Sequence, residues 1–324
     1  MDPLKIIGPV IMLLIILGFV TYAILFERKV LGWMQNRPGP VRTGPWGLLQ
    51  TVADVLKLLI KEDVIPDKAD KTLFKIAPVI AFVPSFAVVA VLPFTDSLFF
   101  ADIAVGLLYY VAISSITIIG ILVGSWASNN KYALMGGMRS AAQMISYEIP
   151  LVMAVVGVIM SAGSLNLRKI VAAQEDVWFI IPQFLGFIVF LIAAIAELNR
   201  TPFDLPEAES ELVAGYHVEY SGFRFAFFML AEYVYVFAMS ALTTVLFLGG
   251  WLPLFGLDFI PPLVWFVLKM LAMVFFIFWL RATFPRIRSD QLMQLGWKVL
   301  LPLALVNIFL SALLKEVPVI GNWF

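Results

Sequence analysis

Four carboxylates lie within or beside long apolar stretches, where a carboxylate can bind and release a proton. Glu148 and Glu232 each fall about nine residues into an apolar run, or about 13 Å deep at 1.5 Å per helical residue. Glu197 and Glu27 fall near the ends of two other runs. A charge at the bilayer centre costs about 2.5–3.5 kcal/mol even on insertion scales. We therefore interpret these residues as a proton-accessible path; structural contacts between helices are the alternative.

A second group of acids occupies residues 199–222, NRTPFDLPEAESELVAGYHVEYSG. Its carboxylates are Asp204, Glu207, Glu209, Glu211 and Glu219. Prolines and aromatic residues are interleaved with them, which favours an ordered, partly buried loop over a solvated run of charge. Carboxylates that lie close together raise one another's pKa, so some of them can hold protons near neutral pH.

The segment 27–75 carries a third pattern. Its RPGP sequence at 37–40 predicts a turn, because proline interrupts helices. Leucine and valine then recur every three to four residues, which predicts an amphipathic helix over 48–61 that is too short to span a bilayer. This helix either braces the fold or forms one wall of a slot open to the bilayer, with Asp54 and Lys57 near a lipid-like ligand.

The composition limits the cofactors that the chain can hold. It has no cysteine and a single histidine, His217, which excludes disulfides, cysteine-ligated iron–sulfur clusters and bis-histidine haem. Lysine plus arginine and aspartate plus glutamate each number 22, so no basic excess points to nucleic acid. We expect no metal site and no redox centre in the polypeptide itself.

These side chains must be positioned by membrane-spanning helices. Of the residues 62% are hydrophobic, and the mean hydropathy is +0.97. The apolar residues come in runs of about 20, the length that crosses about 30 Å of hydrocarbon. We predict an all-α integral membrane protein with a single domain over residues 1–324 and about eight transmembrane helices. The expected spans are 4–26, 76–94, 102–126, 140–162, 179–198, 223–249, 262–283 and 298–315.

Charge asymmetry sets the orientation. The loops after the first, third, fifth and seventh spans hold 17 of the 22 basic residues, so these loops are expected to face the cytoplasm. Both termini and the even loops are then outside, and the amphipathic helix and the acidic loop are on the cytoplasmic side. Lys269 falls inside a span, where it either snorkels to the surface or has another role.

Several segments carry a resemblance to a known family. They are FERKVLGWMQNRPGP (26–40), GLLQTVADVLKLLIKED (47–63), WASNNKYALMGGMRSAAQMISYE (126–148), AELNRTPFDLPEAESELVAGYHVEYSG (196–222), FMLAEY (228–233) and RATFPRIRSDQLMQLGWK (281–298). The chain resembles, over nearly its whole length, the H-subunit family of bacterial respiratory complex I, a proton-pumping NADH:quinone oxidoreductase. The acidic block is the most specific of these motifs.

The resemblance implies a role for particular residues. The residues implied in the quinone chamber are Glu27, Arg28, Arg37, Asp54, Lys57, Phe227, Phe228 and Arg281. Those implied in a proton route are Glu148, Glu197, Glu207, Glu209, Glu211, Glu219 and Glu232. Asp204 is expected to order the acidic loop, and no residue of the chain is expected to be catalytic or to bind metal.

The resemblance also implies the setting. Quinone is the expected substrate, and FMN and iron–sulfur clusters are expected in partner subunits. The expected partners are the quinone-module subunits of the peripheral arm, small and antiporter-like membrane subunits, and membrane lipids, in a bacterial plasma membrane.

Three alternatives remain open at this point. The chain could belong to a related membrane-bound hydrogenase, although the ERKVLGWMQNRPGP and ELVAGYHVEYSG segments favour complex I. A stand-alone ion transporter would be supported by an internal repeat, and none is evident. A simple membrane anchor for a soluble arm leaves the intramembrane carboxylates unexplained.

Overall fold

The computed structural model describes residues 3–206, 209–254 and 259–316, and all regular secondary structure in these ranges is helical. Seven described helices are long and apolar enough to cross a membrane. They are α1 (Pro3–Met34), α3 (Lys71–Val89), α4 (Gly106–Ala127), α5 (Lys131–Ala162), α9 (Gly222–Phe247), α10 (Pro262–Thr283) and the continuous stretch α11 (Ser289–Gln294), Leu295–Leu300 and α12 (Leu301–Lys315). The predicted all-α membrane fold is thereby confirmed.

The fifth expected span, 179–198, differs from the prediction. Only α7 (Phe184–Glu197) is helical there, and it has 14 residues. Residues 179–183 form turns instead, since Pro182 cannot donate a backbone hydrogen bond to a helix. The fifth expected span is therefore a short helix preceded by a partly exposed turn.

Two helices begin earlier than hydropathy predicts because polar residues cap them. The Asp70 side chain accepts hydrogen bonds from the backbone of Thr72 and Leu73 at 3.0 and 3.2 Å, which starts α3. Asn130 accepts from the backbone of Tyr132 at 2.8 Å and starts α5. Such caps satisfy donors that would otherwise lack partners at a helix start.

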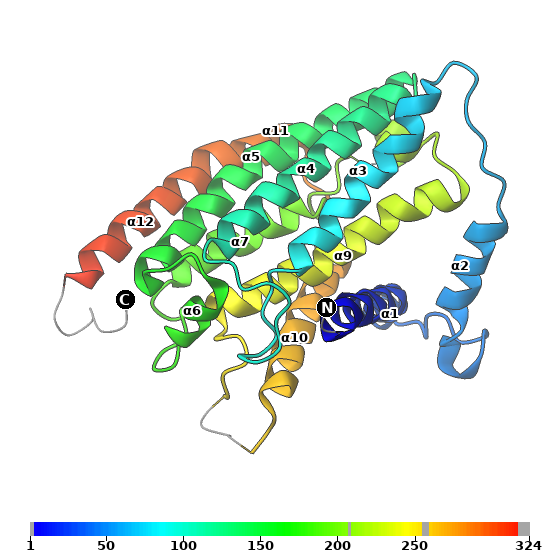
Figure 1. Cartoon of the computed structure of the whole chain (residues 1–324). Coiled ribbons are helices and arrows are strands. Elements are labelled where there is room, and N and C mark those ends of the chain that lie inside the picture. The colour runs from blue at the N-terminus through cyan, green and yellow to red at the C-terminus, as the bar shows by residue number, and fades with distance from the viewer. Residues whose placement is uncertain (1–2, 207–208, 255–258, 317–324) are drawn as a thin grey trace.

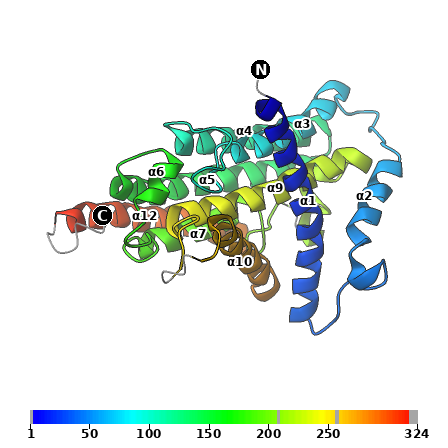
Figure 2. The ribbon, with the colours of Figure 1, turned by 60° about the horizontal axis from the view of Figure 1, so that its bottom comes forward.

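The helices pack around α9. Figure 1 shows α3, α4, α5, α9 and α12 running alongside one another, and Figure 2 shows α1 crossing them steeply. Most of α9 is buried, because α3, α10 and α1 all pack against it. This helix carries three of the predicted site residues, Phe227, Phe228 and Glu232, and places Phe228 and Glu232 inside the bundle.

The ends of the long helices gather on two sides of the bundle (Figure 1). On one side the backbone of Asp70 bonds Ala127, and Asn130 bonds Glu219. We call this the inner side, following the predicted orientation. On the opposite, outer side the backbone of Ile180 bonds Phe247 at 2.9 Å, and the short helix α6 (Leu167–Ala172) packs against α9.

The two inner-side segments have their own helices. The expected amphipathic helix over 48–61 is α2 (Gln50–Ile60), which lies beside α1 and contacts α9 (Figure 2). The acidic loop contains α8 (Glu209–Leu212) and a 3-10 turn at Gly215–His217. Glu207 lies outside the described residues, and so does the side chain of Glu209.

Candidate functional site

Glu27 on α1 is the centre of a buried ionic cluster. Its side chain is 4% exposed. Arg200 Nη1 donates to both carboxylate oxygens of Glu27 at 2.9 Å, and the Tyr233 hydroxyl donates to Oε2 at 2.6 Å. Arg281 Nη1, from α10, also contacts Oε1. The carboxylate of Glu27 on α1 is thus held by side chains from α9, α10 and the loop after α7.

Arg200 joins Glu27 to a second carboxylate. Its Nε lies 2.6 Å from Glu232 Oε1, and its guanidinium lies 4.5 Å from the centre of the Tyr233 ring. Burial opposes the charge of Arg200, but Glu232 and Glu27 outweigh it and hold the pKa above the ordinary arginine value. One permanently charged side chain therefore connects α1 and α9.

The turn after α7 places Arg200 in the cluster. Asn199 adopts φ of 50°, a conformation that asparagine tolerates better than most residues, and ends the helix. Gln143 of α5 then donates to the carbonyls of Ala196 and Phe203 at 2.8 Å each, on both sides of Arg200. Because both ends of the turn are fastened, the arginine points inward rather than to the inner surface.

Two small cavities meet at Glu232. One, of about 110 Å³, is bordered by Arg200, Asp204 and Arg281. The other, of about 50 Å³, is bordered by Glu197. Glu232 and Asn199 border both cavities, and each volume exceeds the roughly 10–15 Å³ that one water requires. The arrangement can hold water between the ionic cluster and Glu197.

Glu197 and Glu148 form a second carboxylate pair, close enough for their charges to interact. Ser115 of α4 donates to Glu148, and Thr117 is hydrogen-bonded to Tyr235 across the second cavity. Glu197 Oε2 is buried without a hydrogen-bond partner among the described residues. Four of the predicted proton-route and chamber carboxylates, Glu27, Glu232, Glu197 and Glu148, are thus brought into two neighbouring groups.

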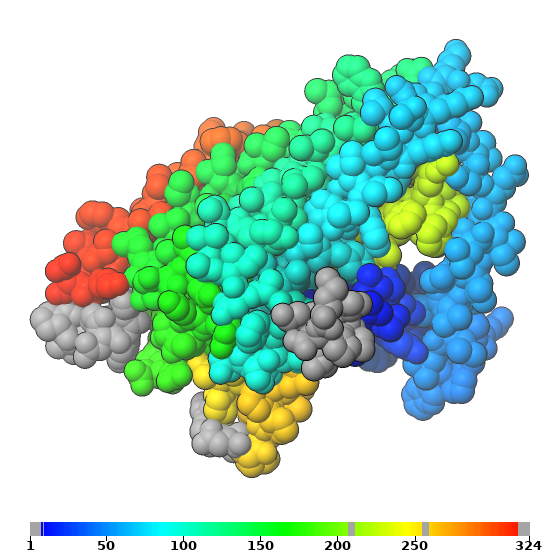
Figure 3. Space-filling view, viewed as in Figure 1, coloured from blue at the N-terminus to red at the C-terminus, as the bar shows by residue number. Residues whose placement is uncertain are grey.

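The other predicted chamber residues lie at the inner end of α1. Arg28 pairs with Asp54 of α2 at 2.6 Å, and Arg28 and Arg37 line a pocket of about 350 Å³. Lys57 is exposed on α2. Figure 3 shows an opening bordered by α1, α2 and the first part of α9.

The two phenylalanines of α9 that were predicted for the chamber, Phe227 and Phe228, have different surroundings. The ring of Phe227 packs edge-on against Phe82 and Phe223, at 5.0 and 4.9 Å between centroids. Phe228 is buried and borders the cavity of Glu197 and Glu232. Only Phe227 is therefore partly exposed, whereas Phe228 belongs to the carboxylate region.

The described acids of the loop do not join the buried cluster directly. Asp204 pairs with Arg286 at 3.1 Å, and burial raises the pKa of Asp204. Glu211 pairs with Arg139 at 2.6 Å on the surface, and Glu219 accepts from Asn130 at 2.6 Å. These contacts tie the loop to α5 and to the segment after α10.

Sequence reasoning missed Arg200 and Tyr233, which complete the cluster. Arg200 counts among the basic residues of an inner loop, so its sequence position indicates a solvated cation. The useful signal is the carboxylates themselves: buried acids near one face require a buried cation. Arg200 lies three residues after Glu197 and was the available candidate.

The described residues also include the side-chain types that hold metal ions. Within the described ranges, no group of three or more histidine, cysteine, aspartate or glutamate side chains is arranged to hold a metal ion. The site offers carboxylates, arginines, hydroxyls and space for water, which suit proton transfer and electrostatic coupling.

Comparison with known proteins agrees with the residues of the site. A family model described as NADH dehydrogenase matches residues 7–312. The H subunit of NADH-quinone oxidoreductase from Anoxybacillus flavithermus is 72% identical over 306 residues, which are 94% of this chain and 92% of that protein. The corresponding subunits of Brevibacillus brevis and Bacillus mycoides are 68% and 70% identical over 308 residues, 95% of this chain and 92% of each relative.

The similarity to these relatives and the seven membrane-length helices show that the chain is a multi-pass protein of the bacterial plasma membrane. Matches of this extent and identity cover the buried cluster, both cavities and the acidic loop. The chain belongs to the family of NADH-quinone oxidoreductase H subunits, which are membrane components of respiratory complex I.

Proposed function

We propose that this chain forms part of the quinone chamber of NADH-quinone oxidoreductase and couples quinone reduction to proton translocation through its buried carboxylates. The observation that carries the proposal is the position of Arg200, which bridges Glu27 and Glu232 between the inner-side pocket and the two water-sized cavities. The remaining subunits supply the electrons and the antiporter-like channels.

The quinone enters, in this proposal, beside α1, α2 and α9. The opening in Figure 3 and the apolar residues exposed on α2, such as Leu56 and Leu59, suit an isoprenoid chain that arrives from the bilayer. The Arg28–Asp54 ion pair holds α2 against α1 and provides polar groups for a quinone headgroup. Phe227 supplies an aromatic wall.

The charge of the reduced quinone acts through the arginines. Arg281 is partly exposed and contacts Glu27, so negative charge placed near Arg281 competes with Glu27 for it. Arg200 is then the main cation that contacts Glu27, and its attraction to Glu232 becomes weaker. A weaker hold on Glu232 favours its protonation, because an opposite charge is what stabilises a buried carboxylate.

Protonation of Glu232 connects to Glu197 and Glu148 through the second cavity. Water in this cavity can reach both Glu232 and Glu197, and Glu197 interacts with Glu148. Glu148 is half-buried on the surface formed by α4 and α5, beside Ser115. A proton can therefore leave the cluster toward neighbouring membrane subunits.

The test is Glu232→Gln in the intact, assembled enzyme in membrane vesicles. Glutamine keeps the size but cannot ionise, so we expect NADH:quinone reductase activity to fall by about tenfold or more, or about 1.4 kcal/mol in barrier height. The number of protons moved per NADH should fall as well.

Glu175→Gln is the matched control, because Glu175 is exposed on the outer side. It should change neither activity nor stoichiometry. Full activity and full stoichiometry in both Glu232→Gln and Glu148→Gln enzymes would refute the coupling role.

A further inference from the structure

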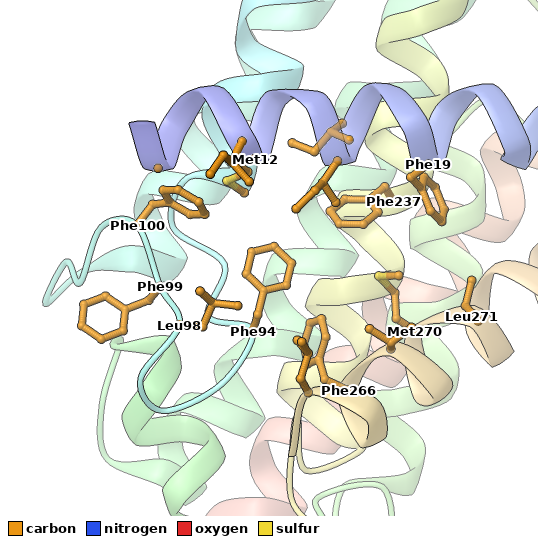
Figure 4. A pocket seen from close by; sticks show the side chains of 16 residues that line it. Met12, Phe19, Phe94, Leu98, Phe99, Phe100, Phe237, Phe266, Met270 and Leu271 are labelled. Carbon is orange, nitrogen blue, oxygen red and sulfur yellow. The ribbon is translucent and has the colours of Figure 1, made fainter. Parts of the chain in front are cut away.

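A large apolar cavity lies on the outer side, away from the carboxylates. Its volume is about 1000 Å³, and α1, α9, α10 and the loop at 94–100 enclose it (Figure 4). Every residue that lines it is apolar, including Met12, Phe266 and Met270. A polar ligand would find no hydrogen-bonding side chain there, so the lining suits a hydrocarbon chain.

The cavity is half a membrane long. On α1 it extends from Gly8 to Phe19, which at 1.5 Å per residue is about 16 Å of the roughly 30 Å of hydrocarbon. Its inner end is closed where Phe19 packs against Phe237, with ring centroids 4.8 Å apart. Beyond this point α1 and α10 meet through the rings of Phe26 and Phe278.

This length distinguishes the occupants. A transmembrane helix of a partner protein is about 10–12 Å wide and needs a groove along the whole span. The aromatic contacts between α1 and α10 exclude such a groove. An acyl chain from a single leaflet has the required chemistry and reaches only to mid-membrane.

The cavity opens sideways toward the bilayer. Ile11 and Ile15 of α1 and Leu271 of α10 line it and are 50%, 61% and 41% exposed. They lie on helices that are expected to contact lipid, so a chain can enter from the leaflet without crossing a polar surface.

Charged residues stand at the outer rim. The guanidinium of Arg168 lies 4.4 Å from the ring centre of Phe99, which lines the cavity. Arg168 pairs with Asp96 and Asp102 at 2.7 and 2.8 Å. The positive charge of Lys169 also attracts the carboxylate of Asp102. Two cations and two carboxylates at one place complement a headgroup that carries both a phosphate and an ammonium. The Asp96 side chain is 78% exposed and accessible to the ammonium.

We propose that this cavity binds one amine-bearing, zwitterionic phospholipid of the outer-side leaflet. One acyl chain fills the space between α1 and α10, the phosphate meets Arg168, and the ammonium meets Asp96. The lipid completes the packing of α1 against α9 and α10 at the outer side.

The experiment counts lipids in the purified intact complex. The complex is washed in detergent until its lipid content is constant, and bound phospholipids are then identified by mass spectrometry. Ile15→Trp places an indole in the cavity and should remove one phospholipid per complex relative to wild type. Leu14→Trp is the matched control, since Leu14 is also 61% exposed but does not line the cavity, and it should retain the lipid.

A second pair repeats the test on α10, in case the first variant does not assemble. Leu271→Trp should remove the lipid, whereas Leu268→Trp, 51% exposed and outside the lining, should retain it. Asp96→Asn should lower the retained fraction of amine-bearing lipid. Equal lipid counts in the cavity variants and wild type would overturn the proposal. So would the loss of a quinone, or of a lipid without an amine, in place of the expected lipid.

Discussion

Two buried cations, Arg200 toward the inner side and Lys269 toward the outer side, are stabilised by different kinds of partner. Arg200 is held by the carboxylates of Glu27 and Glu232, and both carboxylates can take up a proton. Lys269 donates to the carbonyls of Leu248, Gly250 and Leu252 at 2.7, 3.1 and 2.7 Å. Backbone carbonyls do not change charge, so the inner cluster can rearrange whereas the outer one acts as a fixed clamp.

The outer clamp has a second member. The Gln174 side chain accepts from the backbone of Gly249 and Phe179 at 3.0 and 3.2 Å and donates to Val245 at 2.8 Å. Lys269 also lies 3.9 Å from the centre of the Trp178 ring, a cation–π contact. The outer end of α9 is therefore fixed to α6 and α10. We therefore expect any rearrangement of α9 to occur in its inner half, which carries Glu232.

The largest expected effect is a loss of stability when Arg200 is removed from the inner cluster. Arg200→Met leaves Glu232 buried without its cation, and breaking such a pair costs about 3–5 kcal/mol. We expect loss of assembled complex or a marked fall in its thermal inactivation midpoint. Adding Glu232→Gln should recover part of this stability, because the uncompensated charge is removed. Arg139→Met breaks only a surface pair and should change stability by less than about 1 kcal/mol; an Arg200→Met enzyme as stable as this control would contradict the comparison.

Removing the outer cation should affect stability alone. Lys269→Met takes the shared donor from three carbonyls, and an unsatisfied buried group costs about 1–3 kcal/mol. We expect a loss near the top of that range in thermal inactivation, with unchanged NADH:quinone reductase activity per assembled complex. A variant with normal thermal stability and impaired activity would show that the outer region also takes part in coupling.

The sequence predicted the long helices of the fold better than it predicted their ends and the turns between them. Runs of apolar residues predicted the membrane-spanning helices, because the bilayer imposes their length and forces the backbone to bond internally. Their ends were shifted by local chemistry that hydropathy does not register, such as the Asp70 cap. The turns before α7 depend on Pro182 and on long-range bonds from Gln174 to α9, which no local pattern reveals.

The site was predictable to the extent that its residues are costly to bury. Glu148 and Glu232 stood out because carboxylates in apolar runs are expensive. Arg200 did not, since it follows a span in a basic loop, and only the folded turn held by Gln143 directs it inward. Lys269 could snorkel or be enclosed; the structure shows that it is 7% exposed and bonded to the end of α9.

The smallest effect concerns pH on the inner side. Burial lowers the pKa of His217, in the acidic loop, from 6.5 to about 4. The unfolded chain then binds a proton below pH 6.5 that the folded chain does not, so His217 lowers stability as the pH falls from 6.5 toward 4. At pH 5 this amounts to about 2 kcal/mol at 1.36 kcal/mol per pKa unit.

His217→Gln should remove that part of the acid sensitivity. The measurement is the difference between thermal inactivation midpoints at pH 7.5 and pH 5.0, compared between variant and wild-type complex so that other titrating groups cancel. Identical differences in the two enzymes would mean that the loop around His217 opens before the complex unfolds, and the inner side would then be less ordered than its contacts indicate.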